Sequence, residues 1–363
     1  MNAERLHAIV VALKKEITQG RTSSNMQNMV GALQAVVNQS NAATQQNLAS
    51  SLGALYAAVS DTDSDKFSPT WRQILREIGG DCFFGKALKE HIETVLAKNQ
   101  ITPAVALREL LQTLEKLQRF EGALNSAASA FQQFGIGDEK LRPGECEVGV
   151  LIPRQAVKNQ LLDFSEELKE LGFILNTFSE VATGKPDQLE IRTLSSSDLL
   201  VYLQASAPYA ACLAVAIERI VALYKQLLEI RKLHQEIRKQ GVPEKETTGI
   251  EKYANELMQK GIQNASEEIV NEYYQQAEKG RKNELTIAVR LAMSKIANRI
   301  DHGFNLEVRV EPLAKDDTES QNEQLQKAVA AIQSATANMQ FLKLEGEPLL
   351  KLPENTDRPK KKE

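Results

Sequence analysis

The chain has 363 residues, of which 42% are hydrophobic, 25% are charged and 5% are aromatic. This composition excludes a disordered or fibrous chain and supplies enough apolar residues for a globular core, and the length suits two or three domains. The formal net charge of −4 disfavours a nucleic-acid partner, because proteins that bind nucleic acids usually carry a basic field.

The three cysteines, Cys82, Cys146 and Cys212, lie far apart and form no CxxC pair. An odd number without the spacing of metal ligands argues against a disulfide framework and against a zinc site. We therefore expect three buried or half-buried free thiols in a reducing compartment, which indicates a cytoplasmic protein. The first residues have charges on both sides of a short apolar run and predict an amphipathic helix instead of a secretory signal.

Residues 1–138 show only helical periodicity and predict an all-helical domain. Apolar residues recur every three or four positions in six successive segments. Two of these segments start with the pairs Ser68-Pro69 and Thr102-Pro103, in which a capping residue precedes a proline at the first helical position. The sequences Gly135-Ile136-Gly137 and Pro143-Gly144 then break the pattern and indicate a domain boundary.

Residues 145–312 predict a small α+β module. Short apolar or alternating runs indicate strands at 148–152, 173–181, 189–193 and 304–310, with a helix over 155–171. The resulting βαββαβ order is the ferredoxin-like order, with its second helix expanded into a long helical hairpin over about 206–302. The alternative is a three-stranded sheet with an unrelated strand. We expect 304–310 to share a sheet with 148–152, because a lone strand cannot satisfy its backbone groups.

The predicted hairpin carries the clearest interaction pattern. Between Pro208 and Gln240 the chain has no glycine or proline, and apolar positions step by three and four over about three heptads. This spacing is typical of coiled-coil packing, either against the return helix or against a second copy. The candidate interaction residues on this seam are Leu223, Leu227, Ile230 and His234.

A nineteen-residue uncharged stretch, 199–217, has the length of a transmembrane segment. Six of its residues are alanines, which contribute little to membrane insertion, and Gln204, Ser206 and Pro208 interrupt it. The sequence therefore favours the buried start of the hairpin, packed under the sheet, over a membrane segment. Should membrane contact occur, the residues expected to make it are Leu199, Leu200, Leu203, Leu213 and Ile217.

The last part of the chain is predicted as three short pieces. Residues 313–323 are polar and acidic and indicate a linker, and 324–352 indicate a C-terminal helix with a short extension. Residues 353–363 are rich in charge and proline and predict a disordered tail.

No motif in the sequence indicates a catalytic residue, a cofactor or a metal. Gly135-Ile136-Gly137 lacks the third glycine of a dinucleotide-binding loop, and it follows a helix instead of a strand. Three functions stay open: a non-enzymatic interaction or assembly module that uses the hairpin, a membrane-acting effector that exposes 199–217, and an enzyme whose active site the spacing does not reveal. The sequence favours the first, with a protein partner or a second copy as its ligand.

Overall fold

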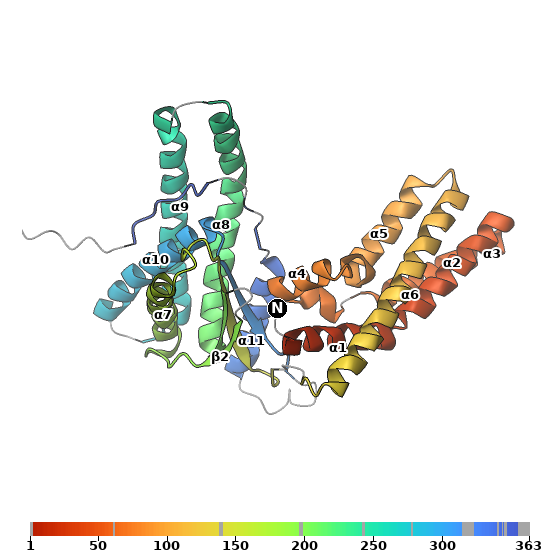
Figure 1. Ribbon diagram of the computed structural model, residues 1–363, viewed down its shortest axis with the longest axis horizontal. Helices are drawn as coiled ribbons and strands as arrows, with labels where there is room; N and C mark the ends of the chain where they lie inside the picture. The colour runs from red at the N-terminus through yellow and green to blue at the C-terminus, as the bar shows by residue number, and fades with distance from the viewer. Residues whose placement is uncertain are drawn as a thin grey trace, which may run out of the picture. The chain divides into compact units, whose positions relative to one another are not determined.

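The computed structural model describes residues 3–60, 62–137, 141–195, 199–241, 244–276, 279–313, 323–339, 341–342, 344 and 347–354 (Figure 1). Over these residues the protein is mainly helical, with one four-stranded antiparallel sheet. The chain divides into two compact units, Met1–Lys140 and Leu141–Glu363, each with its own cluster of buried apolar residues. The predicted disordered tail falls largely outside the described residues.

The first unit is a helical bundle. Its helices are α1 (Ala3–Gly20), α2 (Thr22–Asn38), α3 (Ala42–Ala58), α4 (Pro69–Glu77), α5 (Gly85–Lys98) and α6 (Pro103–Gln133), with 3-10 turns η1 (Asp63–Lys66) and η2 (Asp81–Phe83). The two expected cap-and-proline starts are confirmed: α4 begins at Pro69, where the Ser68 side chain accepts a hydrogen bond from the Trp71 amide, and α6 begins at Pro103. The expectation of three buried or half-buried thiols is wrong for Cys82, which is exposed in η2, while Cys146 and Cys212 are buried.

The second unit combines the sheet with five helices. Its elements are β1 (Cys146–Ile152), α7 (Leu161–Thr183), β2 (Ile191–Ser195), β3 (Leu199–Ala205), α8 (Ala207–Lys239), α9 (Glu244–Tyr273), α10 (Lys279–Asp301), β4 (Asn305–Val310) and α11 (Glu323–Asn338). The strand order is β2-β3-β1-β4. The predicted sharing of one sheet by β1 and β4 is confirmed, because the two pair directly and antiparallel, with Val148 opposite Val308.

The core of this unit lies between the sheet and the helices. Apolar residues of β1 and β4, among them Val148, Val150 and Val308, are buried in this core. α8 contacts both strands, and α10 and α11 contact β4. The first turns of α8 are rich in small residues, and Cys212 and Ala216 are fully buried there. These small side chains allow the helix to approach the sheet closely.

The predicted strand at 173–181 is wrong, because these residues form the second half of α7. The buried residues Leu171, Ile174, Leu175 and Phe178 step by three and four, which is helical spacing. Gly172 does not end the helix. It lies at an open position of α7, since an added Cβ would meet no atom within 4 Å. The missing strand is β3, which lies in the apolar stretch that we expected to form the buried start of the hairpin.

Candidate functional site

The strongest candidate site is a surface of α8, α9 and α10 on which the chain's own residues 347–354 lie. We call these residues the C-terminal segment. It has no helix or strand of its own and crosses the hairpin helices (Figure 1). Leu349, Leu350 and Leu352 are only 2%, 3% and 4% exposed, so the segment inserts its leucines into the core of the unit.

Polar side chains of α9 and α10 bind the backbone of this segment. The Asp301 carboxylate accepts hydrogen bonds from the Leu349 and Leu350 amides, both at 2.6 Å. The Asn298 amide group donates to the Leu352 carbonyl and accepts from the Leu352 N–H, both at 3.0 Å. Four side-chain hydrogen bonds thus hold three residues of backbone, and they do not depend on which side chains those residues carry.

A third side chain completes this binding. Asn255 of α9 accepts a hydrogen bond from the Lys351 amide at 2.7 Å and donates to the Leu349 carbonyl at 3.4 Å. Every amide from Leu349 to Leu352 therefore has a side-chain partner on the helices. Paired backbone groups are a requirement for burying an irregular segment, since an unpaired buried N–H is strongly unfavourable.

Behind the segment lies a buried charged cluster. Arg231 of α8 donates to the Asp301 carboxylate at 2.5 Å and to its backbone carbonyl at 3.1 Å, and the Tyr224 hydroxyl also donates to that carboxylate. The Arg231 and Asp301 side chains are 5% and 0% exposed. Burial, and secondarily the charge of Asp301, raises the pKa of Tyr224, which keeps the hydroxyl protonated as a donor. The cluster fixes the Asp301 oxygen atoms that hold the segment.

Beside the first residue of the C-terminal segment, Glu347, lies a pocket of about 280 Å³. Its lining residues are Arg231, His234, Gln235, Arg238, Lys239 and Glu347. The Arg238 guanidinium pairs with the Glu347 carboxylate at 3.0 Å. His234 Nε2 is 3.6 Å from Glu251, and among the described residues it has no hydrogen-bond partner.

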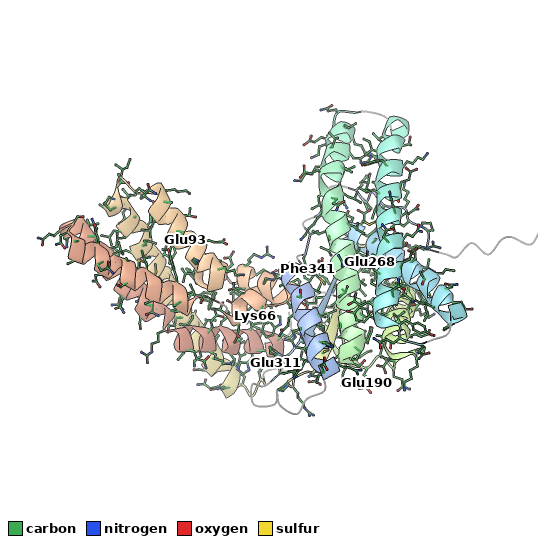
Figure 2. All side chains as sticks on the ribbon, turned by 180° about the vertical axis from the view of Figure 1, so that it is seen from behind. Lys66, Glu93, Glu190, Glu268, Glu311 and Phe341 are labelled. Atoms are coloured by element: carbon green, nitrogen blue, oxygen red, sulfur yellow. The ribbon has the colours of Figure 1, made fainter. Side chains whose placement is uncertain are left out.

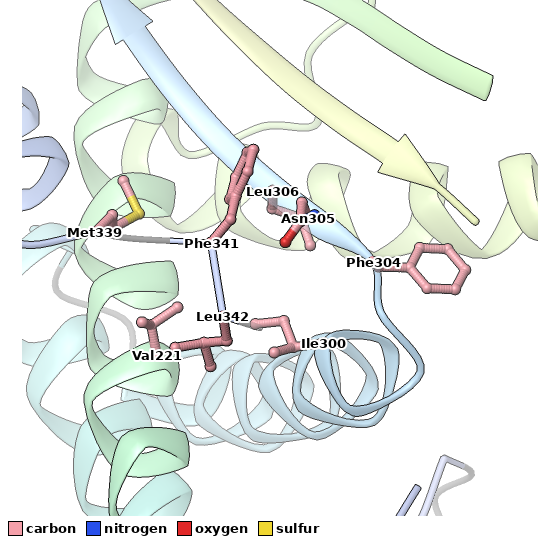
Figure 3. Close-up of a pocket in the computed structure, with 8 residues that line it drawn as sticks. All are labelled: Val221, Ile300, Phe304, Asn305, Leu306, Met339, Phe341 and Leu342. Atoms are coloured by element: carbon pink, nitrogen blue, oxygen red, sulfur yellow. The ribbon is translucent and has the colours of Figure 1, made fainter. Parts of the chain in front are cut away.

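A second cavity is apolar and too small to hold a ligand. Figure 3 shows the side chains that surround it, drawn from α8, α10, β4 and the residues after α11. Its volume is about 10 Å³, which is at most the space of one water molecule. Among the described residues, no group of three or more histidine, cysteine, aspartate or glutamate side chains lies close enough to hold a metal ion.

The four predicted interaction residues all lie on α8, facing the interior of the unit. Leu227 and His234 are buried, and Leu223 and Ile230 are half-buried against the core. At Leu223 the return helix α9 comes close, because a Cβ on Gly261 would be 2.4 Å from Leu223 Cδ2. The outer faces of the hairpin carry charged side chains such as Glu268 (Figure 2). Of the four predicted residues, only His234 lines the pocket beside the C-terminal segment.

The five residues named for membrane contact belong to two elements. Leu199, Leu200 and Leu203 lie in β3, and Leu213 and Ile217 are fully buried in α8. α8 is long and apolar enough to cross a membrane, and 61% of its most apolar window is buried inside the protein. Core helices of soluble proteins pass the same test, so the structure is compatible with a soluble protein.

The residues that bind the C-terminal segment were not found from the sequence. Asn255, Asn298 and Asp301 each lie in a helix next to an apolar stripe, where isolated polar residues are ordinary. One available signal was the segment itself: Leu349, Leu350 and Leu352 lie between Pro348 and Pro353. Apolar residues bounded by prolines favour an extended chain that needs a surface to bury them. Comparison with protein-family models, curated proteins and solved structures finds no match for this chain.

Proposed function

We propose that the protein is a non-enzymatic interaction module whose α8–α9–α10 surface binds an extended peptide segment. The observation that carries this proposal is the binding of the C-terminal segment through its backbone by Asn255, Asn298 and Asp301. Backbone hydrogen bonds supply affinity in peptide recognition, and pockets for selected side chains supply specificity. The buried leucines are the apolar anchors, each contributing about 1.5–3 kcal/mol.

The rest of the unit supports this surface. We propose that the sheet has the ferredoxin-like order, with α8, α9 and α10 in place of the second helix. The antiparallel order β2-β3-β1-β4, and the position of the three helices between β3 and β4 along the chain, support this assignment. In such a scaffold α8 begins directly after β3 and α10 ends shortly before β4, so the sheet positions the two helices that carry Arg231 and Asp301. We place the protein in the cytoplasm, where its thiols stay reduced.

The test is binding of a separate peptide. A chain that ends at residue 346 leaves the surface without its own segment, and a fluorescent peptide of residues 347–354 should then bind to it. Asn298→Ala removes both hydrogen bonds to the Leu352 backbone and should weaken binding at least about tenfold, since each net hydrogen bond contributes about 1 kcal/mol. Asn283→Ala, at an exposed position of the same helix, is the matched control.

The outcomes separate the proposal from a purely structural role of the segment. Saturable binding that Asn298→Ala weakens and Asn283→Ala does not would support it. A folded shortened chain that does not bind the peptide would contradict it. The full-length protein should bind the same peptide far more weakly, because its own segment competes. Sedimentation of the full-length protein at several concentrations then shows whether the segment of one copy also occupies the surface of another.

A further inference from the structure

The pocket beside Glu347 is unusual for its charge. Three of its lining residues, Arg231, Arg238 and Lys239, are cationic, and Glu347 is the one anionic residue that the structure places in its lining. Arg231 is already paired with Asp301 behind the pocket. Arg238 and Lys239 follow in the last turn of α8, where cations are favoured by the helix dipole. The positive side of the pocket is therefore built by one helix end.

Glu347 uses little of this pocket. Its side chain is 73% exposed and pairs with Arg238 at 3.0 Å, while the pocket has a volume of about 280 Å³. His234, which also lines the pocket, is a buried residue with 5% of its surface exposed. Among the residues that the structure describes, its Nε2 has no hydrogen-bond partner and lies 3.6 Å from Glu251. His234 is therefore a polar wall of the pocket whose Nε2 lies beside Glu251, and Arg238 and Lys239 are the cations that remain to meet an anion.

A larger anion fits this arrangement better than a carboxylate. A phosphate group carries close to two negative charges and three acceptor oxygen atoms. Those oxygens can accept from a guanidinium in the two-point geometry that arginine favours, and from a second donor at the same time. Arg238 and Lys239, which line the pocket together with Glu347, supply a guanidinium and an ammonium group as two such donors.

We propose that this pocket recognises a phosphorylated side chain, two residues before the first leucine anchor of the bound peptide. Glu347 of the C-terminal segment then occupies the same position with a weaker anion. This inference rests on the proposed function, since it names a specificity of the same peptide-binding surface. The bound ligand is thus an extended segment with a phosphoserine, a proline and two leucines in succession.

The test uses the full-length chain with different residues at position 347. Chains with Glu347→Ser and Glu347→phosphoserine are compared with the unchanged protein, and amide hydrogen exchange of Leu349 and Leu350 reports how firmly the segment is bound. Phosphoserine should slow exchange about tenfold relative to serine, as expected for one or two new charge-assisted hydrogen bonds. Glutamate should lie between them. Arg238→Gln should remove the gain, and Lys232→Gln, at an exposed position of α8, should not.

Each outcome decides the inference. Equal exchange in the serine and phosphoserine chains would overturn it while leaving peptide binding intact, because the leucine amides would still be protected. Unprotected amides in every chain, the unchanged protein included, would instead overturn the proposed function. Inorganic phosphate is the third arm. If it slows exchange in the Glu347→Ser chain as much as phosphoserine does, the pocket binds free phosphate and the assignment to a peptide side chain is wrong.

Discussion

At the residue scale, the arrangement depends on a few polar side chains inside an apolar interface. Arg231 is buried, and a buried cation is tolerated because Asp301 pairs with it and the Tyr224 hydroxyl shares the same carboxylate. The second oxygen of Asp301 is then available for the amides of Leu349 and Leu350. One carboxylate therefore links α8, α10 and the C-terminal segment.

Removing that carboxylate should destabilise the second unit strongly. Asp301→Ala leaves the Arg231 guanidinium buried without its anion and removes the partners of two amides, so we expect a loss of about 3–5 kcal/mol in the free energy of unfolding. Tyr224→Phe deletes one hydroxyl from the same cluster and should cost about 1 kcal/mol. Urea denaturation measures both. A loss below that of Tyr224→Phe would show that the cluster contributes little.

The thiols give a second prediction at this scale. Burial raises the pKa of Cys146 to about 12, and burial likewise raises the pKa of the fully buried Cys212. At pH 8, well below a pKa of 12, almost all of Cys146 is the unreactive thiol. Titration of the native protein with a thiol reagent at pH 8 should therefore label Cys82 alone, and all three cysteines in denaturant. Rapid labelling of two native thiols would contradict the buried positions.

At the element scale, periodicity predicted the helices of the first unit, but it assigned two segments of the second unit to the wrong kind of element. Residues 173–181 hold apolar side chains at both helical and alternating spacings, and the separating glycine, Gly172, lies at an open position where a helix tolerates it. β3 runs into α8 with only Ser206 between them. The buried strand and the buried first turns of the helix therefore form one continuous apolar run in the sequence. Periodicity gives no boundary between them.

The binding surface could not be derived from the sequence for a different reason. Asn255 and Asn298 are far from the C-terminal segment along the chain, and their hydrogen bonds to Lys351 and Leu352 form only after α9, α10 and this segment have packed. An isolated asparagine in a helix carries no sign of such a partner. By contrast, the pairing of β1 with β4 was predictable, because an alternating strand must find a sheet wherever it lies in the sequence.

The late strand should therefore be essential to its unit. Val308→Asp places a carboxylate at a fully buried position of β4, opposite the buried Val148 of β1. Burying an unpaired charge should unfold the second unit or destabilise it by several kcal/mol. Gln226→Asp adds the same charge at an exposed position of α8 and should change stability by less than about 0.5 kcal/mol. Circular dichroism during thermal unfolding distinguishes the two.

At the scale of the whole molecule, the chain has two separate hydrophobic cores. One consists of residues from α1 to α6, and the other surrounds the sheet and α7 to α11. The Gly- and Pro-containing sequence around 135–144 lies where one compact unit ends and the next begins. Because cooperativity arises within a shared core, each unit should unfold as a unit of its own.

Two core variants test this independence together. Leu110→Ala empties a fully buried position of the first unit and should cost about 2–5 kcal/mol, and Asp301→Ala weakens the second. In thermal unfolding, each variant should lower one transition and leave the other in place. Limited proteolysis should release fragments that end near residues 138–144, since segments between compact units are the usual sites of cleavage. A single transition that both variants lower equally would mean that the two cores stabilise each other and that the chain folds as one cooperative domain.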